Sequence, residues 1–126
     1  MRLARLLAFI VLAAGLAWSD EIAGTWRGES VCLAKGTACR DETVIYRFSR
    51  IAGKPTVFLV SADKIVDGKA VNMGTLEFQY ETEWRELRCH YAQGIWSLKV
   101  EGATIQGTLT RPDRTVFRGL NLRKDP

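Results

Sequence analysis

Few side chains in this sequence could do acid–base or nucleophilic chemistry. His90 is the only histidine among 126 residues, which leaves no histidine cluster for zinc and one candidate base for a Ser–His or Cys–His pair. Cys89 is adjacent, but neighbouring residues of a strand point to opposite faces of a sheet. We therefore expect no catalytic couple and no metal site, and we interpret Cys89 as a buried free thiol that packs as a small apolar side chain.

Inward-facing aromatic residues are the more promising polar groups. Tyr46, Tyr80, Tyr91 and Trp96 are predicted to share a face with aliphatic residues, and a phenolic hydroxyl inside a barrel needs a partner or a wet cavity. That pattern is typical of a small-ligand pocket, so we take these four as candidate ligand-binding residues. Short strands in a small barrel can also fill their own interior, and the sequence leaves both interpretations open.

Cofactor and nucleic-acid motifs do not occur in the sequence. There is no Walker loop, dinucleotide fingerprint or calcium loop, and we expect no cofactor. Acidic pairs such as Asp41 with Glu42 and Glu81 with Glu83 fall at predicted turns or on outward faces, where they are interpreted as surface charge. The 18 basic residues are scattered among 14 acidic ones, which indicates neither a nucleic-acid partner nor an anionic-membrane surface.

The three cysteines predict one disulfide and one remaining thiol, provided that the chain is exported. Cys32 and Cys39 enclose the polar segment LAKGTA, which is typical of a hairpin loop between two strands. Ordinary cross-strand proximity would allow a bridge there. We predict a Cys32–Cys39 disulfide that staples this loop.

Export is predicted from the first residues. Arg2 and Arg5 precede a short apolar run that fades into small residues, with Ala17 at the position that a signal peptidase requires. The run is shorter than the about 20 apolar residues of a membrane span, so we expect none. We predict a signal peptide over 1–17, a single barrel domain over 18–126, and a periplasmic or extracellular location.

The elements that must position these residues are strands. Apolar and polar residues alternate along segments rich in β-branched and aromatic side chains, and turn residues such as Asp67-Gly68 and Pro112-Asp113 separate the segments. No helical period lasts for three turns. The predicted strands are 25–32, 42–49, 56–62, 75–81, 84–91, 94–100, 103–110 and 115–122.

Each of these strands has one apolar face, as Val44, Tyr46 and Phe48 illustrate. Short connections favour a meander, and closure removes its exposed edges. We predict an all-β fold, a single small eight-stranded antiparallel up-and-down β-barrel, with an open two-sheet sandwich as the alternative. Segment 61–74 resists assignment, and we expect a short strand or one helical turn there that acts as a lid.

The motif Gly24-Thr25-Trp26 resembles the lipocalin and wider calycin signature. In that superfamily the tryptophan closes one end of the barrel and an arginine at the end of the last strand packs across it. The resemblance implies that Gly24 and Trp26 form the closure with Arg123, and that Arg118 is the reserve. Strand parity turns Arg118 toward the apolar side, where its guanidinium would need a carboxylate, a carbonyl or a ring face.

Two narrower resemblances lead to different functions. The mature chain resembles short exported bacterial lipocalin-like proteins of unassigned activity, through Gly-x-Trp-x-Gly and the cysteine pair that Asp41-Glu42 follows. The segment AGTW at 23–26 with its following cysteine is similar to periplasmic inhibitors of secreted bacterial metalloproteases. In those inhibitors the free N-terminal segment blocks the protease cleft, which implies that role for 18–22.

We therefore predict a monomeric, non-enzymatic carrier or sensor of a small, partly apolar ligand. The ligand would lie between Tyr46, Tyr80 and Trp96, with 61–74 over one mouth of the barrel. The alternative is a protease inhibitor acting through 18–22, and the third hypothesis is a barrel isomerase that uses a tyrosine as its acid.

Overall fold

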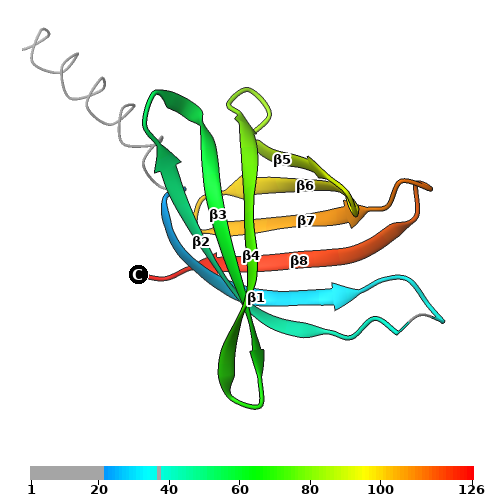
Figure 1. The fold of residues 1–126 in the computed structure, drawn as a ribbon. Helices are drawn as coiled ribbons and strands as arrows, with labels where there is room; N and C mark the ends of the chain where they lie inside the picture. Colours follow the sequence, from blue (N-terminus) through cyan, green and yellow to red (C-terminus); the bar gives the residue numbers. More distant parts are fainter. Residues whose placement is uncertain (1–21, 37) are drawn as a thin grey trace, which may run out of the picture.

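The predicted closed barrel is present. The structure, a computed structural model, describes residues 22–36 and 38–126, in which eight antiparallel strands close in sequence order (Figure 1). The predicted signal peptide over 1–17 lies outside the described residues. The strands are β1 Gly24–Cys32, β2 Glu42–Ile51, β3 Lys54–Val66, β4 Lys69–Glu81, β5 Glu86–Tyr91, β6 Gly94–Glu101, β7 Thr104–Thr110 and β8 Val116–Lys124.

Strand parity correctly predicts the core. Apolar residues at alternate positions of β2 and β6 point inward, and the intervening residues face solvent or the outer wall. Closure depends on β1 pairing with β8 as well as with β2, so no edge is left between the first and last strands. The largest fully buried side chains are Trp26, Phe58, Phe78, Leu87, Leu98, Ile105, Leu120 and Val44.

One end of the barrel, here called the closed end, is built around Trp26. This side chain is fully buried, and its indole Nε1 donates a hydrogen bond to the carbonyl oxygen of Ile22 at 2.9 Å. The Phe48 ring packs edge-on against it at 6.1 Å between centroids. A cation lies over the Trp26 ring as expected, but it is Lys124 and not Arg123. The Nζ atom of Lys124 is 5.9 Å from the ring centroid.

Arg123 was expected to pack across Trp26, but it lies one residue away from that position in the pairing of β1 with β8. Trp26 pairs with Lys124, whereas Arg123 pairs with Arg27 and is exposed on the outer face. Because successive residues alternate between faces, a shift of one residue moves a side chain from the interior to solvent.

The described loop residues at the other end of the barrel, here called the open end, are 33–36 with 38–41, 67–68, 92–93 and 111–115. The predicted disulfide lies there, because Cys32 and Cys39 are bonded across the first of these loops with their Cα atoms 5.9 Å apart. Cys89 is a buried free thiol, as expected.

Segment 61–74 differs from the expected lid. It continues β3 and β4, each 13 residues long, into a hairpin that turns at Asp67-Gly68. Figure 1 shows the tip of this hairpin extending beyond the neighbouring strands. A register shift near its base pairs Ala62 with Gly74 and Asp63 with Asn72, which leaves Met73 as the extra residue of a β-bulge.

Polar side chains hold this bulge from the outer wall. The Arg47 guanidinium donates to Asp63 Oδ2 at 2.8 Å, and the Asn72 amide donates to Asp63 Oδ1 at 2.9 Å. The backbone N–H of Gly74 donates in turn to Asn72 Oδ1 at 2.9 Å. The hydrogen bond from Arg47 is the main reason that the pKa of Asp63 lies below its usual range.

The folded protein should therefore become less stable in acid, because Asp63 becomes protonated there. A carboxyl with a depressed folded-state pKa stabilises the fold above its unfolded pKa of about 3.9, and the contribution is lost as pH falls through the folded pKa. We expect Asp63→Asn to unfold more easily than wild type at pH 7 and to lose less stability on acidification below about pH 4. Thermal unfolding across pH measures this, and parallel pH profiles for the two proteins would contradict it.

Gly107 marks a close approach of strands within the barrel wall. A Cβ there would overlap the carbonyl oxygen of Ser97 and lie 2.7 Å from the Cα of Leu98. Only glycine fits between these backbones.

We expect Gly107→Ala to destabilise the protein by about 2 kcal/mol or more, as overpacking in a rigid wall does. Gln106→Ala, on the exposed side of the same strand, should stay within about 0.5 kcal/mol of wild type. Urea unfolding with unchanged m-values measures both, and equal effects of the two substitutions would contradict the close approach.

Candidate functional site

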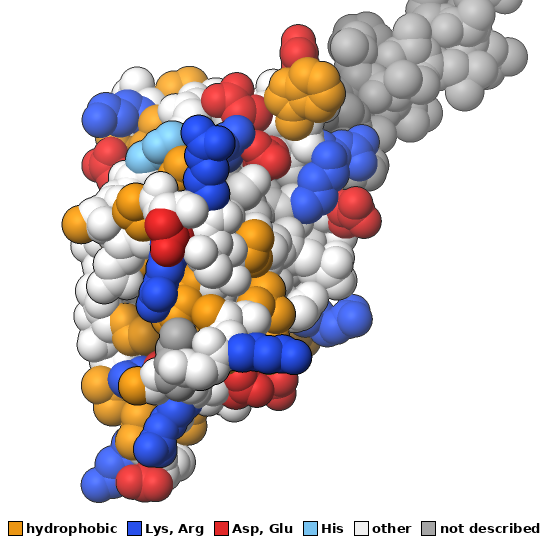
Figure 2. All heavy atoms as spheres, turned by 90° about the vertical axis from the view of Figure 1, so that its right-hand side faces the viewer, with side chains coloured by type: hydrophobic (Ala, Val, Ile, Leu, Met, Phe, Trp, Pro, Cys, Tyr) orange, Lys and Arg blue, Asp and Glu red, His pale blue; other side chains and the backbone are white. Residues whose placement is uncertain are grey.

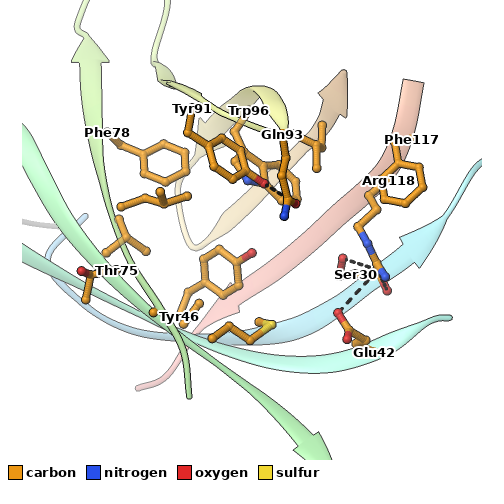
Figure 3. Close-up of a pocket in the computed structure, with 16 residues that line it drawn as sticks. Ser30, Glu42, Tyr46, Thr75, Phe78, Tyr91, Gln93, Trp96, Phe117 and Arg118 are labelled. Atoms are coloured by element: carbon orange, nitrogen blue, oxygen red, sulfur yellow. Dashed lines mark hydrogen bonds and ion pairs between the residues drawn. The ribbon is translucent and has the colours of Figure 1, made fainter. Parts of the chain in front are cut away.

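A cavity of about 530 Å³ occupies the open end of the barrel (Figure 3). Aliphatic and aromatic side chains form its walls, and a few polar groups lie at its mouth. Its lining residues are Ser30, Glu42, Tyr46, Val60, Ala62, Met73, Gly74, Thr75, Leu76, Phe78, Tyr91, Gln93, Trp96, Leu109, Phe117 and Arg118. Three of the four predicted ligand-binding residues therefore lie together here.

Tyr46 is the central polar group of the cavity. Its side chain rises from β2, the residue is only 6% exposed, and Figure 3 shows its hydroxyl pointing into the cavity. The hydroxyl has no hydrogen-bond partner among the described residues, and no fully buried polar side-chain atom there lacks one, so its oxygen is reachable from the cavity. Burial raises the pKa of Tyr46, and the nearby Tyr91 and Glu42 raise it further. The phenol therefore stays neutral and is a hydrogen-bond donor.

Tyr91, Gln93 and Trp96 form the facing wall. The hydroxyl of Tyr91 donates to Gln93 Oε1 at 3.4 Å, a long hydrogen bond that a closer acceptor could replace. Burial raises the pKa of Tyr91 more than the hydrogen bond with Trp96 lowers it. This wall thus offers a neutral phenol and a side-chain amide next to the apolar Trp96 ring.

Arg118 lies at the mouth of the cavity. Its guanidinium contacts a carboxylate, a carbonyl oxygen and a ring face, the three kinds of partner expected for an inward-pointing arginine. Its guanidinium donates to Ser30 Oγ at 2.9 Å and to the carbonyl oxygen of Arg40 at 2.8 Å. It lies 3.6 Å from the Glu42 carboxylate and 5.6 Å from the centroid of the Phe117 ring. Because it sits at the open end, Arg118 takes no part in closing the barrel over Trp26.

Two bulges aim side chains into the cavity mouth. Met73 is the extra residue of the β3–β4 bulge, and Phe117 is the extra residue where Leu109 pairs with Arg118 and Thr110 with Val116. Bulges re-aim side chains beside functional sites. Simple alternation misplaces both residues; Gly74, with a φ of +106°, is the one local signal, and it marks only the first bulge.

The barrel is weakest beside the cavity. Only three residue pairs, from Gln79 to Glu81 on β4, join β4 to β5. Along the edge that faces β5, the residues of β4 before Gln79 pair with no strand among the described residues, although they still pair with β3. Leu76 of β4 and Tyr91 of β5 lie beyond the last pair, and both line the cavity.

Tyr80 is the predicted ligand residue that lies elsewhere. Its ring packs edge-on against Phe58, with 6.4 Å between centroids, and it does not line the cavity. Alternation along the strand correctly predicts that Tyr80 points inward, but it does not give the position of Tyr80 along the barrel axis. Phe78 and Gln93, which the sequence did not single out, line the cavity instead.

The remaining sequence candidates supply no chemistry to the cavity. Cys89 is buried and His90 is exposed, so the two point to opposite faces as parity predicted. No group of three potential metal ligands occurs within residues 22–36 and 38–126. Of the predicted inhibitory segment 18–22, only Ile22 is described, and it is buried against the core with its carbonyl oxygen bonded to Trp26.

Comparison with known proteins adds no family name. No family model, no curated protein and no solved structure matches this chain. Nor does the described part of the chain contain a helix long and apolar enough to cross a bilayer. Fold and site together define a closed eight-stranded antiparallel β-barrel with a cavity at one end.

The unpartnered Tyr46 hydroxyl predicts a contrast between two conservative substitutions. Tyr46→Phe removes a group that bonds to no described residue, so the free energy of unfolding should change by less than about 0.5 kcal/mol. Ser30→Ala removes an acceptor of Arg118 and should cost about 1 kcal/mol or more. Chemical denaturation measures both. A large loss of stability in Tyr46→Phe would show that the hydroxyl is part of the fold.

Proposed function

We propose that this chain is an exported, non-enzymatic binding protein of the lipocalin-like type, which carries or senses a small, partly apolar ligand in the open-end cavity. The observation that carries the proposal is the hydroxyl of the buried residue Tyr46, which has no partner among the described residues and points into a cavity of about 530 Å³. A buried polar group with no protein partner favours a site that a ligand or water completes.

The cavity walls indicate the chemistry of the ligand. Phe78, Trp96 and Leu109 offer apolar surface for a flat or branched hydrocarbon body. Tyr46 has a raised pKa, so it donates a hydrogen bond and keeps its proton. A ligand with a carbonyl or ether oxygen opposite Tyr46 would fit best. The same raised pKa makes Tyr46 a poor general acid, which favours binding over the isomerase hypothesis.

Export is the other part of the proposal. The disulfide between Cys32 and Cys39 is typical of an oxidising compartment, and the predicted signal peptide would deliver the chain there. The calycin assignment is supported by Gly24 and Trp26 at the start of β1 and by a cation, Lys124, over the Trp26 ring. These features together support a location in the periplasm or outside the cell.

Binding can be tested with prodan, a neutral naphthyl ketone whose fluorescence shifts to the blue in apolar surroundings. We expect a saturable blue shift with the wild-type protein. Tyr46→Phe should weaken binding about tenfold, since one hydrogen bond from a desolvated donor is lost. Tyr80→Phe is the matched control and should bind as wild type does.

A variant that fills the cavity tests prodan binding without changing the Tyr46 hydroxyl. Ala62 lines the cavity wall, and Ala62→Phe should abolish the blue shift while circular dichroism still shows the strands. No saturable shift with wild type, or equal binding by wild type and Ala62→Phe, would overturn the proposal. Native mass spectrometry of protein from its own host should then show a small-molecule adduct that Ala62→Phe lacks.

A further inference from the structure

The open end gathers basic residues that are scattered in the sequence. Counting its loops and the three strand residues on either side of each, seven basic residues lie there against four acidic ones. The basic residues are Lys35, Arg40, Lys64, Lys69, Arg111, Arg114 and Arg118, and the acidic ones are Asp41, Glu42, Asp67 and Asp113. They come from three separate loops, which explains why no basic run appears in the sequence.

Most of the acidic side chains at this end are engaged within the protein. Asp41 Oδ1 accepts the backbone N–H of Cys32 at 2.8 Å, and Asp113 Oδ1 accepts that of Thr115 at 2.9 Å. Glu42 lies between Arg118 and Lys64, at 3.6 Å from each. With seven basic residues against these four acidic ones, the open end carries a net positive charge.

The same end carries most of the exposed apolar surface. Of the seven large hydrophobic side chains exposed on the described chain, five are in the open-end loops, in their flanks or at Met73 on the cavity rim. They are Leu33, Val66, Val71, Met73 and Val116, each between 43% and 48% exposed. Figure 2 shows orange and blue patches side by side on this face, down to the tip of the projecting β3–β4 hairpin.

The hairpin tip combines both properties on one face. Val66 pairs directly with Lys69 and Val71 pairs directly with Lys64 across the two strands, and cross-strand partners share a face. Lysine stems can lie along an apolar layer while their ammonium groups reach a polar boundary above it. A face of alternating valine and lysine is therefore suited to the boundary between headgroups and acyl chains.

We propose that the open end docks on the surface of an anionic phospholipid bilayer, with the β3–β4 hairpin tip and the Leu33 and Val116 loops entering the headgroup layer. Basic residues favour the negative headgroups, and the exposed apolar side chains gain by leaving water. A nucleic acid would use the charges but leave the apolar residues exposed. The proposal rests on the surface alone and does not require that the cavity bind a ligand.

The closed end is a poorer candidate for such a surface. Among the residues that the structure describes, its only exposed large hydrophobic side chain is Trp84, at 67%. The exposed carboxylates Glu81, Glu83 and Glu101 lie on the strand ends and turn around it. Exposed basic residues at this end offset these carboxylates; they are Arg50, Lys54, Arg85, Arg88 and Lys99. The two ends therefore differ in exposed apolar surface rather than in the sign of their charge, and the apolar side chains of the open end set the orientation.

Sedimentation with lipid vesicles tests the proposal. We expect the mature protein to sediment with vesicles rich in phosphatidylglycerol and not with pure phosphatidylcholine. The double variant Lys35→Glu/Lys69→Glu should lower the partition coefficient by at least about 30-fold, from roughly fivefold per basic residue. Lys54→Glu/Arg123→Glu carries the same charge change at the closed end and should keep more than half of the binding.

A second pair of substitutions separates membrane docking from charge alone. Val66→Ser/Val71→Ser leaves the charge unchanged and should weaken vesicle binding about tenfold without changing retention on heparin, a soluble polyanion. Equal binding to phosphatidylglycerol and phosphatidylcholine, equal losses in the two charge variants, or no effect of the serine variant would each overturn the proposal. Because prodan binding is measured without vesicles, failure of docking and failure of the carrier function remain distinguishable.

Discussion

Everything in this structure depends on the antiparallel pairing of β1 with β8, which closes the sheet. Closure removes the free edges between the first and last strands and forces every alternate side chain into one shared interior. At one end that interior is filled by Trp26 and the rings around it. At the other end the same strands spread, and the interior becomes a cavity.

The contrast between the two ends arises from strand length and register rather than from composition. β3 and β4 extend as a long hairpin, whereas β5 is six residues long and pairs with β4 through three residues only. The ladder between β4 and β5 therefore ends before Leu76 and Tyr91, which both line the cavity. Bulges then turn Met73 and Phe117 toward the mouth.

Sequence alternation predicted the eight strands and their faces, because these follow from a period of two, and three of the four residues proposed as ligand-binding do line the cavity. The disulfide followed from the short polar loop between Cys32 and Cys39. Position along the barrel axis does not follow from that period, which is why Tyr80 was placed in the site although it packs on Phe58. A register error of one residue likewise exchanged Arg123 for Lys124. The charge pattern of the open end depends on which loops meet in space, and linear spacing does not contain that information.

The interior beside Tyr46 is a cavity, and we propose that a ligand or water completes it. A crystal structure of the protein from its own host, at a resolution that shows ordered water, tests this directly. We expect electron density for a ligand or water within hydrogen-bonding distance of Tyr46 Oη, about 2.5–3.0 Å. A cavity filled by repacked side chains, with Tyr46 bonded to another protein group, would contradict it.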